Sequence, residues 1–192
     1  MTSSQIGRSK RVILRPISET DGETLFYYRN ITNVALYQDW APESPQEVRA
    51  YAQEMAKRAP FAVGEWYQIA IVEKISEQII GDLAVCIDKE TKQTAELGIA
   101  LDPKYQRQGF AKEAVWAICD YLFSNKELHR IHASIDPRND ACLRLFSSIG
   151  FREEGVHIES YYSKGEWCDD LVMAILKREW INRPDQPQKE ND

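Results

Sequence analysis

TAELGIALDPKYQRQGFAKEA, residues 94–114, decides the fold and the candidate site, because its hydrophobic period changes halfway along. The first nine residues alternate, which predicts a strand, and from Gly109 the apolar residues recur at helical spacing. The turn between them holds Gly109 and Ala111, with basic and amide side chains around them. A helix start carries unpaired N–H groups and the positive end of the helix dipole. The turn is therefore a candidate anion site.

The turn matches neither of two common phosphate-binding motifs. No Gly-Lys-Ser/Thr follows it, so it is not a P-loop, and the three-glycine spacing of the dinucleotide fingerprint is missing. Arg107, Lys104 and Lys112 add positive charge nearby. An ordinary strand–helix connection is an equally good interpretation of the turn alone, since helix N-termini are common.

The strand before the turn has two unlike faces. The apolar face, expected to point to the core, carries Ala95, Leu97, Ile99 and Leu101. The other face carries one acid and two very small residues, Glu96, Gly98 and Ala100. Glycine inside a strand often marks a close backbone approach, so this face resembles the floor of a ligand cleft. For Glu96 alone, a solvated acid on an exposed face is the competing interpretation.

Composition limits the class of protein. The chain has 192 residues, 43% of them hydrophobic, which fits one domain. A net charge of -6 without a basic run argues against nucleic-acid binding. No apolar run has membrane-spanning length, and the N-terminus lacks the apolar region of a signal peptide. Four cysteines without a CxxC pair suggest free thiols, so we expect a cytoplasmic protein.

The remaining pattern predicts one mixed α/β domain over residues 10–180. Strands are expected at residues 11–17, 66–74, 78–88, 94–102, 130–136, 156–162 and 170–177, and helices at 18–30, 45–58, 109–124 and 139–148. The unit from Thr94 to Asp136 should be a parallel crossover. We expect a central mixed sheet of about seven strands flanked by helices. Residues 1–9 and 181–192 are polar and are expected to be flexible.

Several segments together resemble a known family. AELGIALDPKYQRQGFAKEA is similar to motif A of the GNAT acyltransferases, Q/R-x-x-G-x-G/A, with Gln106, Gly109 and Ala111 in the signature positions. DPRNDACLRLFSSIGF, residues 136–151, resembles the family's next segment, an Asn-led helix that ends in Gly-Phe. RVILRPI, the tripeptide at residues 40–42 and GEWCDDLVMAILKREW resemble the RimJ/RimL-like branch. The resemblance covers roughly residues 10–180.

The resemblance implies that acetyl-CoA is the cosubstrate, without a metal. The coenzyme's pyrophosphate would be held by the turn, whose residues are Gln106, Arg107, Gln108, Gly109, Phe110, Ala111 and Lys112. Its pantetheine arm would pair with the strand backbone at Ile99, Ala100 and Leu101, and a strand N–H would polarise the thioester carbonyl. Asn139, at the start of the later helix, would touch the same arm.

Acetyl transfer to an amine needs a base, an oxyanion donor and a partner for the departing thiolate. We expect Glu96 to be the base and to contact the acceptor together with Trp40. Relatives often carry a Tyr where this chain has Phe146, and the RimJ/RimL-like branch often a Ser where it has Cys142. Cys142 is therefore a candidate donor or a packing residue, because a thiol donates weakly. Tyr161 and Tyr162 are unassigned alternatives.

The expected function is N-acetyl transfer to a primary amine by direct attack in a ternary complex. The sequence does not distinguish two classes of acceptor, a protein N-terminal α-amino group and a small amine such as a polyamine or an aminoglycoside. Asp39, Glu43 and Glu159 could give the cleft a negative rim. The alternatives are a non-catalytic CoA-binding module and a domain for another phosphate ligand. His129 and His132 point to opposite strand faces, which disfavours a shared metal. A homodimer through the C-terminal hairpin is one option for the oligomeric state.

Overall fold

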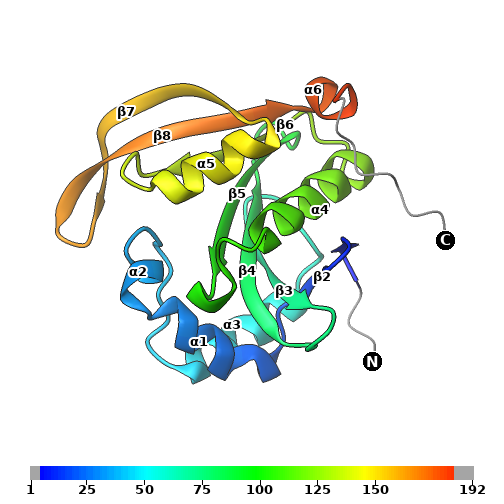
Figure 1. Ribbon diagram of the computed structural model, residues 1–192, viewed down its shortest axis with the longest axis vertical. Coiled ribbons are helices and arrows are strands. Elements are labelled where there is room, and N and C mark those ends of the chain that lie inside the picture. The colour runs from blue at the N-terminus through cyan, green and yellow to red at the C-terminus, as the bar shows by residue number, and fades with distance from the viewer. Residues whose placement is uncertain (1–4, 184–192) are drawn as a thin grey trace.

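A twisted mixed sheet with helices on both faces forms the framework of the protein (Figure 1). The computed structural model describes residues 5–183. The sheet has eight strands in the order β1-β2-β3-β4-β5-β6-β8-β7. The strands are β1 (Gly7–Arg8), β2 (Val12–Pro16), β3 (Trp66–Glu73), β4 (Ile79–Ile87), β5 (Thr94–Leu101), β6 (Arg130–Ile135), β7 (Arg152–Ser163) and β8 (Glu166–Leu176). The helices are α1 (Gly22–Arg29), α2 (Thr32–Ala35), α3 (Pro45–Ala56), α4 (Phe110–Asn125), α5 (Asp140–Ile149) and α6 (Lys177–Ile181).

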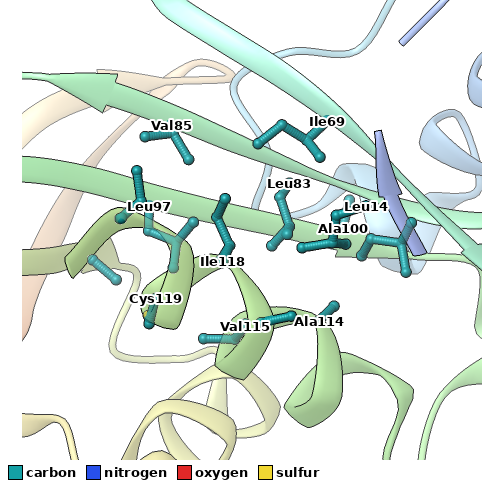
Figure 2. Packing of buried hydrophobic residues seen from close by; sticks show 14 of the residues in the cluster. Leu14, Ile69, Leu83, Val85, Leu97, Ala100, Ala114, Val115, Ile118 and Cys119 are labelled. Carbon is teal, nitrogen blue, oxygen red and sulfur yellow. The ribbon is translucent and has the colours of Figure 1, made fainter. Parts of the chain in front are cut away.

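The main hydrophobic core lies between α4 and one face of the sheet. Figure 2 shows Val115 and Ile118 of α4 directed toward Leu83 of β4 and Leu97 of β5. These four side chains are at most 2% exposed. Burying one large aliphatic side chain is worth about 1.5–3 kcal/mol, so this contact fixes α4, and with it the turn that precedes it, against β5.

The opposite face of the sheet carries a buried polar cluster beneath α1. The Asp82 carboxylate of β4 is fully buried and accepts hydrogen bonds from Tyr28 Oη, from the Arg29 guanidinium and from Gln68 Nε2. Arg29 Nη1 also donates to the carbonyl of Trp40 at 2.8 Å. The ion pair therefore ties the segment after α2 to the centre of the sheet.

Strands β5 and β6 separate partway along their length, which opens the sheet at its centre. They are parallel, as the predicted crossover through α4 requires, and only three register pairs join them: Thr94–Arg130, Ala95–Ile131 and Glu96–His132. Beyond that point β5 stays paired with β4 as far as Leu101, and β6 stays paired with β8 as far as Ile135. The two strands diverge from the third pair onward, and we call the gap between them the splay.

The predicted fold class and the single mixed domain are confirmed, with local differences. Gly7 and Arg8, expected to be flexible, form the eighth strand by pairing with Leu14 and Ile13. Helix α2 was not predicted, and β7 begins at Arg152 rather than at residue 156. The polar start of β7 hid the strand, because β7 is an exposed edge strand on which polar residues are stable. Residues 184–192 of the predicted tail lie outside the described residues.

Candidate active site

The turn before α4 contains two residues with positive φ, one of them a glycine. Gly109 is the N-cap of α4 with φ of 85°, and Arg107 has φ of 58°. Glycine adopts positive φ without steric cost. A Cβ atom added at Gly109 would lie 3.0 Å from Arg11 Nη2, so a side chain there would make a tight contact with the arginine. Because Gly109 has no side chain and is exposed, a ligand can reach the backbone of the turn there.

Side chains on both sides hold the turn in place. Gln106 Nε2 donates to the Leu101 carbonyl at 3.0 Å, and Gln108 Nε2 donates to the Lys104 carbonyl at 2.8 Å. Arg11 Nη2 donates to the Gln108 carbonyl at 2.9 Å. These bonds are made to carbonyl groups, so they orient the turn without using its N–H groups.

A continuous run of N–H groups is left available for a ligand. Within residues 5–183, the N–H groups of residues 107–112 donate no backbone hydrogen bond, and the first one used belongs to Glu113, which donates to the Gly109 carbonyl at 3.1 Å. Phe110 is buried and can offer only its N–H group, whereas Arg107 and Lys112 are exposed and add positive charge. This donor set fits a pyrophosphate group at a helix N-terminus.

The exposed edge of β5 faces the splay. The backbone N–H of Asp102 donates to the Ile80 carbonyl at 2.9 Å, and the backbone N–H of Asp88 donates to the Thr94 carbonyl at 2.8 Å. The backbone groups of the even-numbered residues of β5 are therefore bonded to β4. The Leu97 carbonyl, the Ile99 backbone groups and the Leu101 N–H therefore point into the splay, where an extended ligand could pair with them. The Leu97 N–H belongs to the pairing of Glu96 with His132, and the Leu101 carbonyl accepts from Gln106. Of the three predicted pantetheine contacts, Ala100 differs, because its backbone belongs to the ladder with Asp82 and its side chain is buried.

A cavity of about 420 Å³ lies within the splay. Its lining brings together four residues predicted for the site, Glu96, Ile99, Asn139 and Cys142. Trp40 is not among the lining residues, so the predicted acceptor contact is not supported by the geometry. Its ring instead packs 4.5 Å from the Arg29 guanidinium, and its neighbour Asp39 reaches the cavity.

Sequence reasoning missed or undervalued several lining residues. Tyr37 and Gln38 come from the segment after α2, and Asp170 comes from β8. Asp39 was expected only as part of a negative rim. The acidic pair at residues 169–170 in the C-terminal strand was the one available signal for Asp170.

Glu96 is a half-buried carboxylate at the base of the splay. Burial raises its pKa above the ordinary value, and the charges of Asp170 and Asp39 raise it further. Its Oε2 atom lies 3.9 Å from His132 Nε2. Burial, reinforced by Arg130, lowers the pKa of His132, so the imidazole beside Glu96 is neutral at pH 7. A carboxylate with a raised pKa in a cleft is suited to act as a general base.

The start of α5 lies on the other side of the cavity. Asn139 caps the helix by accepting a hydrogen bond from the Cys142 N–H at 3.2 Å. Burial raises the pKa of the Cys142 thiol to about 12, and burial is also the main cause that raises the pKa of Tyr161 to about 12. Both groups line the cavity, as does the buried ring of Phe146, and both are protonated throughout the neutral pH range.

A family model for the acetyltransferase (GNAT) domain matches residues 11–152 of the sequence. The chain belongs to the GNAT acetyltransferase family. Its relatives include the uncharacterized N-acetyltransferase YnaD of Bacillus subtilis, 28% identical, with 90% of this chain and 97% of that protein covered. Another is the ribosomal protein uS5-alanine N-acetyltransferase of Escherichia coli, 30% identical over 84 residues, with 44% of this chain and 43% of that protein covered. Both relatives agree with the resemblance found in the sequence.

Solved structures have the same fold as this GNAT protein. Spermidine N-acetyltransferase of Vibrio cholerae, in complex with CoA and spermine, superposes with a TM-score of 0.78 at 23% identity, over 91% of this chain and all of that one. Family membership makes this chain an acetyl-CoA-dependent N-acetyltransferase. The turn before α4 and the β5 edge are the parts of its site that suit the coenzyme.

No helix within residues 5–183 is long and apolar enough to cross a membrane. No group of three or more His, Cys, Asp or Glu side chains in the same part of the chain is placed to hold a metal ion.

Proposed function

We propose that this GNAT protein acetylates a primary amine of a small acceptor that carries a second positive charge, such as a diamine or polyamine. The observation that carries this proposal is the charge of the cavity lining. Four carboxylates line the cavity, from Asp39, Glu96, Asp136 and Asp170, whereas no lysine or arginine of residues 5–183 does. An amine acceptor is cationic at neutral pH, so such a lining attracts it.

The four carboxylates are not equally available to an acceptor. Asp136 is paired with Arg138 at 2.6 Å, which neutralises most of its charge. Asp170 accepts a hydrogen bond from Ser134 Oγ at 2.5 Å but has no Lys or Arg partner within residues 5–183. Glu96 and Asp39 also lack a Lys or Arg partner in that part of the chain. Three unneutralised acids around one cavity favour an acceptor with more than one ammonium group.

The site residues suggest a division of labour in the reaction. Bound acetyl-CoA supplies the activated acetyl group, and the N–H groups of residues 107–112 hold its pyrophosphate. Glu96 takes a proton from the acceptor ammonium, and the neutral amine then attacks the thioester carbon. The backbone N–H of Ile99 on the β5 edge stabilises the oxyanion. Tyr161 or Cys142 supplies a proton to the departing thiolate and takes back the second proton that the acetylated nitrogen loses.

Two other functions are alternatives that the experiment below distinguishes from this proposal. A protein N-terminal α-amino group is the acceptor named for the Escherichia coli relative, and it presents one cation at the reacting end. A CoA-binding module without catalysis is compatible with Phe146 in place of a tyrosine. The acidic lining favours the small dication over both, because neither alternative calls for several unneutralised carboxylates.

The test compares amines that differ by one charge. CoA release is measured with 1,4-diaminobutane, with butylamine and with a peptide that starts with alanine. We expect kcat/KM for the diamine to exceed that for butylamine by about tenfold, which corresponds to about 1.4 kcal/mol. Asp39→Asn should reduce this preference, whereas Glu43→Gln, an exposed neighbour outside the cavity, should not. A preference for the peptide, or coenzyme binding without turnover on any amine, would contradict the proposal.

A cytoplasmic location and a homodimer also belong to the proposal. All four cysteines are free thiols, which suits a reducing compartment. The β7–β8 hairpin exposes Ile158, Tyr162 and Trp167, which could bury one another across a twofold axis. Light scattering of the purified protein checks the second point, since a monomer at micromolar concentration would exclude this dimer.

A further inference from the structure

Residues 35–39, which we call the strap, cross the mouth of the splay from the end of α2. Figure 1 shows α2 beside the tip of the β7–β8 hairpin. Lys164, in the hairpin turn, donates from Nζ to the carbonyl of Ala35 and to that of Leu36 at 2.9 Å. These carbonyls end a helix, where a cation is favourable. The strap therefore joins the helical half of the protein to the hairpin across the open site.

Two further contacts of the strap reach into the splay. Tyr37 Oη donates to the Arg138 carbonyl at 3.3 Å, and Gln38 Nε2 donates to the Ile99 carbonyl at 3.3 Å. Both distances are long for hydrogen bonds, so the contacts are weak. The Ile99 carbonyl lies on the β5 edge that suits the pantetheine arm. Gln38 thus makes the hydrogen bond that an amide N–H of the coenzyme would make.

The strap is anchored more firmly at the end where it meets Trp40. The Trp40 carbonyl accepts from Arg29, whose guanidinium is paired with the buried Asp82. Asn30 Nδ2 donates to the Pro42 carbonyl at 2.9 Å just beyond. Breaking the buried pair costs far more than breaking the long contacts of Tyr37 and Gln38. A displacement of Gln38 should therefore move residues 37–39 and leave Trp40 and the Lys164 contacts of Ala35 and Leu36 in place.

We propose that Gln38 occupies the place of acetyl-CoA on β5, and that the coenzyme must displace it to pair with the Ile99 carbonyl. The inference rests on the proposed function. Tyr37 and Asp39 line the acceptor cavity on either side of Gln38, so its displacement changes the cavity as well as the coenzyme edge. Gln38 is thus a positioning residue that competes with the coenzyme at the edge of the acceptor cavity.

The test measures the affinity for acetyl-CoA by calorimetric titration. Gln38→Ala removes the competing donor, so Kd should fall by about two- to threefold, the effect of one weak hydrogen bond. Gln53→Ala is the matched control, because Gln53 lies on α3 and donates to Glu19 Oε2 away from the site. An unchanged or higher Kd for Gln38→Ala, with normal binding by the wild type, would overturn the inference alone. Loss of binding by the wild type would instead overturn the proposed function.

Discussion

Glu96 and His132 form the last register pair that joins β5 to β6, and their Oε2 and Nε2 atoms lie 3.9 Å apart. The base candidate thus sits where the splay begins, beside a neutral imidazole that does not compensate its charge. We predict that kcat/KM rises with pH through the raised pKa of Glu96. Glu96→Gln should lower kcat/KM by about 100-fold or more and remove this acid limb. Exposed Glu90→Gln serves as the control, and an unchanged profile for Glu96→Gln would remove Glu96 as the base.

The ionised Glu96 carboxylate should lower the free energy of unfolding of the protein. The folded-state pKa of Glu96 is raised above the ordinary value of 4.5, so ionisation favours the unfolded chain, and stability falls as pH rises through the folded-state pKa. Glu96→Gln should therefore melt at a higher temperature than the wild type at pH 7. The difference should vanish below about pH 4, where both states are protonated. A lower melting temperature for the variant at pH 7 would argue against an unfavourable carboxylate.

The two candidate donors for the thiolate can be separated by single substitutions. Tyr161→Phe should lower kcat by about 10–100-fold, because a phenol whose pKa is about 12 stays protonated and can donate. Cys142→Ala should retain nearly normal turnover, since the buried thiol is a weak donor beside Phe146. Steady-state kinetics at saturating acetyl-CoA checks both. The reverse result would assign the role to Cys142.

Gly98 should control the size of the acceptor cavity. A Cβ atom added there would contact only the Ala84 Cβ atom, at 3.9 Å, so Gly98→Ala should fold normally. Gly98→Val extends further into the cavity and should raise KM for the diamine about tenfold while the melting temperature changes little. If Gly98→Val bound the diamine as the wild type does, the acceptor would have to lie elsewhere.

The buried pair beneath α1 should dominate local stability. Asp82→Ala leaves the Arg29 guanidinium buried without a carboxylate to balance its charge, which should lower the free energy of unfolding by about 3–5 kcal/mol in urea titrations. Glu23→Ala removes an exposed partner of Arg49 and should change it by about 1 kcal/mol or less. Similar effects of the two substitutions would mean that the Asp82 pair is not the anchor of the Trp40 segment.

The turn before α4 was predictable because its signal is local, whereas the cavity was not. Gly109 and the change of hydrophobic period predict the start of α4 to within a few residues. The splay depends on where the β5–β6 register ends, and no local pattern encodes that point. Ile99 is half-exposed because it lines the cavity in the splay, and Ala100 is buried opposite Asp82 of β4, which reverses the simple alternation. The packing of Trp40 could not be predicted because its partner, the buried Arg29, looks like an ordinary surface residue in the sequence.

The most direct measurement is a thermal melt with and without acetyl-CoA. A ligand that binds only the folded state adds about 2.7 kcal/mol at about 100 times its Kd. The melting temperature should therefore rise by about 5–10 °C in a domain of this size. Gly109→Ala, which places a Cβ atom 3.0 Å from Arg11 Nη2 at positive φ, should melt cooperatively but shift less. If saturating acetyl-CoA leaves the wild-type melting temperature unchanged, the turn before α4 does not hold the coenzyme and the proposed reaction cannot occur there.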